Sequence, residues 1–319
     1  MEQFSALAAH VRGELSKVVI GQRDVVDQLL LTLVCGGHAV IEGVPGLAKT
    51  LLVKSLARVC GLSFHRVQCT PDLMPADITG TNVFNLGDSA FHLHRGPVFT
   101  DLLLVDEINR TPPRTQSALL EAMEERQVTI DGVRYALSEN FTVLATQNPI
   151  EFEGTYPLPE AQLDRFLFKI RIVYPSAEEE AEILSRYDKG FDPRRLDEME
   201  LTPFEPSLLV GARKEIQSVT VEPTLYPYIV SLVRRTRDWP AISLGASPRA
   251  AVGLFFVARA LAAMDGRDYL LPDDVKAAAL PVLRHRILLK PEAELEGLTH
   301  DQVIEQVVAT VEIPRVIRE

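Results

Sequence analysis

The feature that most constrains the fold is an alternation of short apolar, β-prone runs with helical patterns between about residues 38 and 175. The β-prone runs read HAVIEG, SFHRVQ, DLLLVDEI, NFTVLATQ and FLFKIRIVY, and the helical patterns cover residues 50–60 and 113–125. Strands that alternate with helices usually pair in parallel, with helices on both faces of the sheet. The sequence therefore predicts an α/β fold built on a mostly parallel sheet sandwiched by helices.

Two stretches interrupt this alternation. TGTNVFNLGDSAFHLHRGPVF alternates with period two around NLGDS, and RQVTIDGVRYAL does so around DG, a dipeptide favoured in two-residue hairpin loops. Both are predicted to be inserted β-hairpins. The first carries His92 and His94 on one strand face without an obvious carboxylate partner. That pattern fits surface or hydrogen-bonded histidines better than a metal pair.

The C-terminal part of the chain has a helical pattern. SAEEEAEILSRY opens on a serine cap, and SPRAAVGLFFVARALAAM and LPDDVKAAALPVLRHRILL repeat apolar residues every three or four positions. A segment rich in proline and charge, from about residue 188 to 206, is the predicted linker. We therefore expect an α/β core at residues 1–188, followed by a linker and an all-helical second domain at residues 189–319.

Composition restricts the partners and the compartment. The chain has 319 residues and 46% hydrophobic content, enough to supply cores for about two domains. Its net charge of -11 and pI near 5.2 make nucleic acid the less favoured partner. Cys35, Cys60 and Cys69 lack metal-ligand spacing and lie among apolar neighbours, which predicts buried, reduced thiols. The N-terminus lacks a basic start followed by an apolar core, and no run reaches membrane-spanning length, so we expect a cytoplasmic protein without membrane insertion.

The loop GVPGLAKT directly follows a predicted strand and precedes a predicted helix, which is the setting of a phosphate cradle. Gly43 and Gly46 permit the turn, Lys49 is placed for the outer phosphates, and Thr50 offers a hydroxyl to magnesium. Ala48 replaces the usual last glycine, and we expect it to adopt a helical conformation. A coincidental strand-to-helix turn is the alternative. The predicted binding residues are Gly43, Val44, Pro45, Gly46, Leu47, Ala48, Lys49, Thr50 and Leu51.

Polar side chains end two later strands. Asp106 and Glu107 close LLLVDE, an arrangement that can hold hydrated magnesium with one carboxylate and polarise an attacking water with the next. Asn148, after VLATQ, could hold the same water with its amide. The alternatives are a solvated acidic turn and a turn asparagine before proline. Arg110 and Arg114 follow the acidic pair and are not assigned to the site.

The longest motifs together resemble the MoxR family of AAA+ ATPases. They read GQRDVVDQLLLTLVCGGHAVIEGVPGLAKT, GPVFTDLLLVDEINRTPPRTQSALLEAMEERQVTIDG, VLATQNPIEFEGTYPLPEAQLDRFLFKI and GASPRA. The resemblance as a whole extends over nearly the entire chain. The resemblance implies an AAA+ phosphate-loop core with a C-terminal helical lid domain. It also implies that the chain binds and hydrolyses ATP with Mg²⁺.

The resemblance assigns roles to single residues. Residues 43–50 would bind the triphosphate, Thr50 and Asp106 would organise magnesium, Glu107 would be the general base and Asn148 the first sensor. Arg165 of DRF would be an arginine finger that reaches the nucleotide of the neighbouring subunit in a ring, usually a hexamer.

Three further residues receive roles in the same way. Arg249 of GASPRA would be the second sensor, acting in its own subunit, and Val19 and Ile20 would line the adenine pocket. The alternatives are a surface ion pair of Arg165 with Asp164 or Glu160, an ordinary exposed Arg249, and a plain apolar lead into a helix at Val19 and Ile20.

For function, the resemblance implies an ATP-driven machine that remodels, assembles or matures partner proteins, including by metal insertion. A protein with a von Willebrand factor A domain would be the adaptor or client. A nucleic-acid motor is the alternative, although the second hairpin offers only Arg126 and Arg134 as basic residues. A non-hydrolysing switch and a small-molecule kinase fit less well, because neither needs the whole set of Glu107, Asn148, Arg165 and Arg249.

Overall fold

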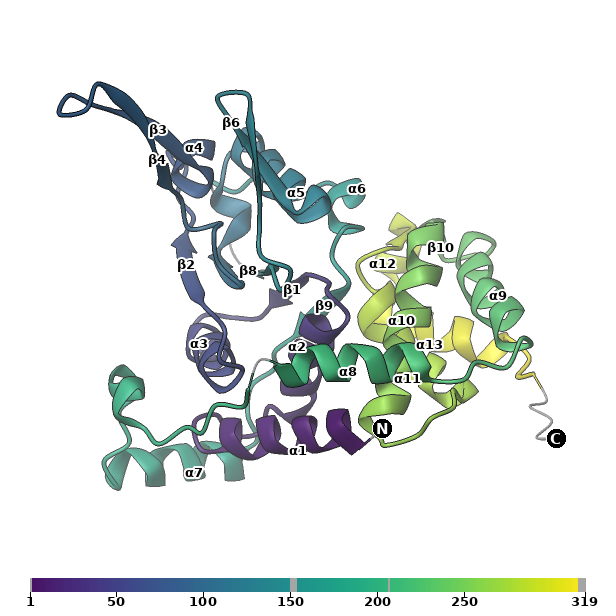
Figure 1. Cartoon of the computed structure of the whole chain (residues 1–319). Coiled ribbons are helices and arrows are strands. Elements are labelled where there is room, and N and C mark those ends of the chain that lie inside the picture. Colours follow the sequence, from purple (N-terminus) through teal and green to yellow (C-terminus); the bar gives the residue numbers. More distant parts are fainter. Residues whose placement is uncertain (1, 150–153, 206, 315–319) are drawn as a thin grey trace.

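The computed structural model describes residues 2–149, 154–205 and 207–314, and it contains the predicted parallel sheet (Figure 1). Its five strands lie in the order β2-β5-β8-β1-β9 and are all parallel. The bounds are β1 Ala39–Glu42, β2 Phe64–Gln68, β5 Leu102–Asp106, β8 Thr142–Gln147 and β9 Phe168–Arg171. Because the strands run in parallel, the carboxyl ends of β1, β5 and β8 meet at one edge, where Glu42, Asp106 and Gln147 lie.

Helices cover both faces of this sheet. Successive strand residues face opposite sides: Ala39 and Ile41 pack into one apolar cluster with α1, α2 and α3, and Val40 packs into another with α4 and α5. The bounds are α1 Glu2–Ser16, α2 Arg23–Val34, α3 Lys49–Val59, α4 Pro75–Thr79 and α5 Pro113–Glu125. The predicted α/β sandwich is thus confirmed. Among the described residues, no helix is long and apolar enough for a membrane crossing.

Both predicted hairpins are present and extend from the core on the same side (Figure 1). One consists of β3 Gly80–Asn85 and β4 Ala90–Arg95, the other of β6 Gln127–Ile130 and β7 Val133–Ala136. Asn82 donates from Nδ2 to Asp131 Oδ2 at 2.8 Å and so links them. His92 lies 2.5 Å from Asp88 Oδ2, a carboxylate partner that the sequence pattern missed, and this supports the hydrogen-bonded alternative for that histidine.

The C-terminal domain consists mainly of helices that follow α7, and it lies to the right of the core in Figure 1. Ser176 caps α7, as predicted, and Ser247 caps α10. The predicted helical pattern at 271–289 is wrong in its last part, since the helix ends at Leu283 and Leu288–Leu289 pairs with a short strand. The bounds are α7 Ala177–Asp188, α8 Ser207–Ser218, α9 Leu225–Arg237, β10 Ile242–Leu244, α10 Pro248–Met264, α11 Pro272–Leu283, β11 Leu288–Leu289, α12 Pro291–Leu295 and α13 His300–Thr310.

The segment predicted as a linker is bound to the core. It contains a short 3-10 helix, η2 Pro193–Glu198, whose Leu196 is buried. Arg58 of α3 donates to the carbonyl oxygens of Leu196 and Met199, and Phe204 donates from its amide to Val59 O at 2.9 Å. The connection between the domains is therefore fixed along the helix that follows the GVPGLAKT loop.

The three cysteines are free thiols. Cys60 and Cys69 are buried, as predicted, whereas Cys35 is half-buried. Burial raises the pKa of the Cys69 thiol to about 11, which keeps that side chain protonated at neutral pH.

Candidate nucleotide-binding site

The GVPGLAKT loop connects β1 to α3, as predicted. Gly46 has φ +88° and requires glycine by conformation, whereas a Cβ at Gly43 would lie 3.0 Å from the carbonyl oxygen of Ile172. The prediction for Ala48 is wrong: it caps α3 in the left-handed conformation, with φ 53° and ψ 25°, rather than in the helical one. A left-handed turn there orients the loop before the helix begins, which explains why glycine is usual at this position.

The first turn of α3 brings the predicted metal ligands to the end of β5. Thr50 donates from Oγ1 to Asp106 Oδ2 at 3.3 Å, and Lys49 donates from Nζ to the carbonyl oxygen of Gly43 at 2.6 Å. A hydroxyl and a carboxylate side by side fit Mg²⁺, which binds few protein oxygens and retains several waters. Lys49 and Thr50 therefore face the loop and the acidic strand end from one helical turn.

A cavity of about 450 Å³ joins these groups. It is lined by Pro45, Gly46, Leu47, Ala48, Lys49, Thr50, Leu51, Asp106, Glu107, Thr146, Asn148, Tyr187 and Pro193. Asp106 and Asn148 are both buried, which argues against a merely solvated turn at either position. The structure thus brings the predicted loop, acidic pair and first sensor into one site.

A second cavity of about 160 Å³ continues from the first on the side of α7, and the two share Gly46, Leu47, Ala48, Leu51 and Tyr187. Val19 and Ile20 line it, together with Ile183 and Phe191. The first cavity lies against the loop and holds the charged and polar side chains of Lys49, Thr50, Asp106, Glu107 and Asn148. Its neighbour is walled mainly by apolar side chains. This arrangement suits a ligand with an anionic end and a flat apolar ring.

Arg165 and Arg249 lie together, but not at these cavities. Arg249 donates from Nη2 to Glu124 Oε1 at 2.6 Å, and Arg165 Nε lies 3.9 Å from Glu124 Oε2. Arg165 also donates from Nη1 to Leu120 O at 3.0 Å. Neither arginine is among the described residues that line the two cavities. Glu124 thus takes the place of Asp164 and Glu160, the partners considered for Arg165, and the roles of both arginines stay predictions.

Comparison with known proteins decides the family. Residues 38–168 match a family described as ATPase family associated with various cellular activities (AAA), and residues 234–307 match the AAA lid domain. The chain is 43% identical to chaperone MoxR1 of Mycobacterium tuberculosis, over 95% of this chain and 81% of that protein. The chain belongs to the MoxR family of AAA+ ATPases. Protein MoxR of Methylorubrum extorquens is 33% identical over 90% of this chain and 89% of its own length.

The MoxR assignment extends to the three-dimensional structure. The crystal structure of a proposed ATPase from Cytophaga hutchinsonii superposes with a TM-score of 0.89 at 44% identity, covering 98% of this chain and 96% of that one. Both the parallel-sheet core and the helical lid domain are thus those of an AAA+ ATPase, and the chain is a nucleotide-binding ATPase of this family.

Around the MoxR acidic pair, the structure adds residues that the sequence prediction missed. Asp106 Oδ1 accepts from Thr146 Oγ1 at 2.6 Å, and Asp106 Oδ2 accepts from Arg66 Nη2 at 2.7 Å. Glu107 forms an ion pair with Arg110 at 3.1 Å and accepts from Gln68 Nε2, also at 3.1 Å. The available signal was positional: Arg66 and Gln68 alternate on the strand that neighbours β5, and Gln68 pairs in register with Asp106.

Proposed function

We propose that this chain hydrolyses ATP in a homo-oligomeric ring, most simply a hexamer, and uses the cycle to remodel, assemble or mature partner proteins. One observation carries the proposal. Lys49, Thr50, Asp106 and Glu107 gather at one cavity, while Arg165 and Arg249 gather on Glu124 away from it. Such a division fits an active site that two neighbouring subunits complete together.

Binding would use both cavities. The backbone N–H groups of the loop and the ammonium of Lys49 would hold the triphosphate, because a helix N-terminus and a lysine both favour negative charge. Val19, Ile20 and Tyr187 would contact the base, since they line the apolar cavity next to the loop. Thr50 and Asp106 would hold Mg²⁺, whose charge would offset that of the phosphates.

Glu107 would act as the general base toward the attacking water, and Asn148 would orient that water with its amide. Glu107 lines the cavity and is held there by Gln68 and Arg110, which fixes the direction of its carboxylate. Asp106 is held in turn by Thr146 and Arg66. These contacts orient both carboxylates before a nucleotide binds, which is the form of preorganisation that catalysis needs.

Arg165 would reach the γ-phosphate bound by the neighbouring subunit, where a finger of this kind contributes on the order of 10³ to 10⁵ in rate. Arg249 would act across the same boundary, because Glu124 places it beside Arg165. The alternative, which the resemblance implies, is that Arg249 serves the nucleotide of its own subunit.

The β3–β4 hairpin would contact the partner protein. Its exposed side chains include four large apolar ones beside polar ones: Val83, Phe84, Leu86 and Phe91 are 52%, 46%, 86% and 70% exposed. Apolar surface of this kind fits a protein partner better than a phosphate backbone, which would need basic residues. The name of the M. tuberculosis relative, a chaperone, agrees with this choice. A von Willebrand factor A domain protein remains the expected adaptor or client.

Glu107→Gln tests the proposal, because a subunit with this change should bind ATP without hydrolysing it and keep the ring on its partner. The tagged variant is purified with ATP and Mg²⁺, and protein and nucleic acid in the eluate are identified. Lys49→Ala, which should not bind ATP, is the control. ATP-dependent enrichment of a specific protein supports remodelling, whereas salt-sensitive recovery of nucleic acid alone would favour the motor.

A further inference from the structure

Three consecutive residues of the lid domain bind the backbone of the segment that carries Arg165. Arg284, His285 and Arg286 lie between α11 and β11, and the segment comprises residues 164–169. Arg284 donates from Nη1 to Lys169 O at 3.3 Å, and His285 Nε2 bonds to Phe166 O at 2.8 Å. The lid therefore binds both the middle and the end of this segment, although the bonded residues are more than a hundred positions apart in the sequence.

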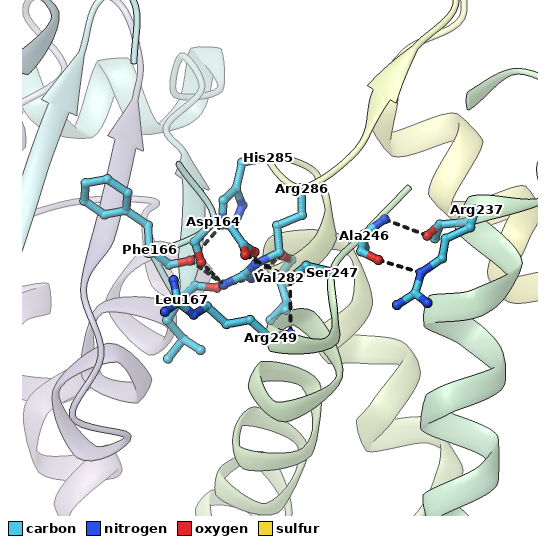
Figure 2. Close-up of polar contacts among 11 residues, drawn as sticks. Asp164, Phe166, Leu167, Arg237, Ala246, Ser247, Arg249, Val282, His285 and Arg286 are labelled. Carbon is cyan, nitrogen blue, oxygen red and sulfur yellow. Dashed lines mark hydrogen bonds and ion pairs between the residues drawn. The ribbon is translucent and has the colours of Figure 1, made fainter. Parts of the chain in front are cut away.

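Arg286 makes most of these contacts (Figure 2). Its guanidinium donates to Asp164 Oδ1 at 2.8 Å, to Asp164 O at 3.1 Å, to Phe166 O at 2.6 Å and to Leu167 O at 3.1 Å. Its side chain is only 2% exposed, and burial lowers its pKa to about 10, so it stays charged at neutral pH. A planar group with five N–H donors fixes the direction of each carbonyl that it binds.

Asp164 joins this contact to the helix that carries Arg249. Asp164 Oδ2 accepts from Ser247 Oγ at 2.8 Å, and Ser247 Oγ accepts from the backbone N–H of Arg249 at 3.1 Å, capping α10 (Figure 2). One carboxylate therefore connects Arg286 with the start of α10. Arg165 directly follows Asp164 in the chain, and Arg249 lies two residues after the capping Ser247. The backbones of both arginines are therefore fixed by the same Asp164–Ser247 contact.

We propose that Arg286 is a positioning residue that fixes Arg165 within the framework of the lid domain, and so sets where this arginine meets the neighbouring subunit. The inference rests on the proposed function, which makes Arg165 a trans-acting residue. Arg286 itself touches neither cavity among the described lining residues, and it acts only through the backbone on either side of Arg165. If Arg286 only stabilised the fold, its loss would weaken the protein without a defect specific to Arg165.

The test uses Arg286→Lys and Arg286→Met, with Arg267→Met as the matched control. Arg267 is a lid arginine that binds Asp274 at 2.6 Å, and its side chain also bonds to Asp265 and to the carbonyl oxygen of Tyr269, which both belong to the lid. Its loss should therefore weaken the lid but leave residues 164–169 in place. Arg286→Lys keeps the charge but loses the planar fork. We expect it to lower kcat about 10- to 100-fold, with KM for ATP within about threefold, because a small misplacement of a catalytic group costs rate rather than binding.

Hydrogen exchange of the protein without nucleotide provides a readout that does not depend on activity. The amides of Phe166 and Leu167 donate to Leu163 O and His38 O, at 3.0 and 2.7 Å. Peptides over residues 164–169 should exchange at least about tenfold faster in Arg286→Lys and be unchanged in Arg267→Met. Unchanged exchange in Arg286→Lys would overturn the proposal.

Rings that mix two variants show whether the activity lost in Arg286→Lys comes from a displaced Arg165 or from a damaged nucleotide pocket. Arg286→Lys subunits keep their own Lys49 and Glu107, and Glu107→Gln subunits supply an intact Arg165. In an equal mixture roughly one interface in four pairs a working pocket with a correctly placed arginine, so activity should exceed the sum of the separate rings. Arg165→Ala mixed with Glu107→Gln is run in parallel. Recovery for Arg165→Ala but not for Arg286→Lys would refute the positioning role, whereas no recovery in either mixture would refute the trans action of the proposed function.

Discussion

Thr146 donates a hydrogen bond from Oγ1 to Asp106 Oδ1 at 2.6 Å, and Thr146 Oγ1 also accepts from the backbone N–H of Glu107 at 2.8 Å. Thr146 is fully buried, so no bulk water reaches it to replace either bond. One side chain of β8 therefore orients both members of the acidic pair on β5.

Thr146→Val keeps the shape of this side chain and removes both hydrogen bonds. We expect kcat to fall about tenfold, and the free energy of unfolding to fall by about 1–3 kcal/mol, because a buried carboxylate oxygen and a buried N–H lose their partner. Thr142→Val is the control, since Thr142 is buried on the same strand but bonds to Asn140 O at the far end. Steady-state kinetics and urea unfolding measure both effects. Equal loss of activity in the two variants would contradict the role of Thr146.

Arg66 donates to the same Asp106 oxygen that Thr50 contacts. We expect Arg66→Gln to lower the Mg²⁺ concentration for half-maximal ATPase activity by about three- to tenfold, because a cation next to a metal ligand repels the metal and occupies its oxygen. A titration of Mg²⁺ at fixed ATP measures the shift, with Arg134→Gln on the exposed hairpin as control. A higher Mg²⁺ requirement in Arg66→Gln would contradict this prediction and show that the orienting effect of Arg66 on Asp106 outweighs its repulsion of the metal.

The left-handed conformation of Ala48 predicts that two alanine-to-glycine changes differ in their effect on the free energy of unfolding. Ala48→Gly should change the free energy of unfolding by less than about 1 kcal/mol, because relief of the left-handed conformation offsets the greater freedom of the unfolded chain. Ala57→Gly, in the buried interior of α3, should cost about 1 kcal/mol or more. Denaturant unfolding and ATP titration measure both variants. A clear loss of stability in Ala48→Gly would indicate that the residue is helical after all.

His38 predicts a pH dependence of stability. Its Nδ1 accepts from the amide of Val143 at 2.9 Å, its Nε2 bonds to Met123 O at 3.2 Å, and burial lowers its pKa to about 4. The unfolded chain takes up a proton near pH 6.5 while the folded chain does not, so this contribution to stability is complete above pH 6.5 and declines as the pH falls toward 4.

The expected loss from His38 is about 2 kcal/mol in the free energy of unfolding between pH 7 and pH 5. His38→Gln can keep one acceptor and one donor without titrating, so its stability should fall less over the same range. Urea unfolding at both pH values, taken as the difference between the two proteins, cancels the contributions of other groups. The same pH dependence in both would contradict a buried neutral His38.

Local patterns were enough to predict the sheet, the hairpins and the loop, because each depends on residues close together in the sequence. The positions of Lys49, Thr50, Asp106 and Glu107 followed from strand ends, since parallel strands place their carboxyl ends at one edge. The conformation of Ala48 was missed because a helix-forming residue type gave no sign of the left-handed turn that this loop imposes.

The supporting contacts could not be predicted from one sequence. Arg66 and Asp106 are 40 residues apart, and Arg286 and Asp164 are 122 apart, so no spacing rule connects them. The local sign for Arg286 was a pair of arginines inside an apolar run, VLRHRILL, and that run was predicted only as part of a helix. Where Arg165 and Arg249 lie relative to each other likewise depends on how two domains pack.

One apolar core runs through both domains: α1 and α2 contribute to the same cluster as α8, α10 and α11. Opening a hinge between the domains would expose part of that cluster to water, at a cost of about 25 cal/mol for each Å² of apolar surface. Each subunit should therefore move as a rigid block. In the proposed ring, the motion that ATP drives is then expected at the interfaces between neighbouring subunits, where a change at one nucleotide site would tilt the whole of the next subunit and the hairpins that it carries.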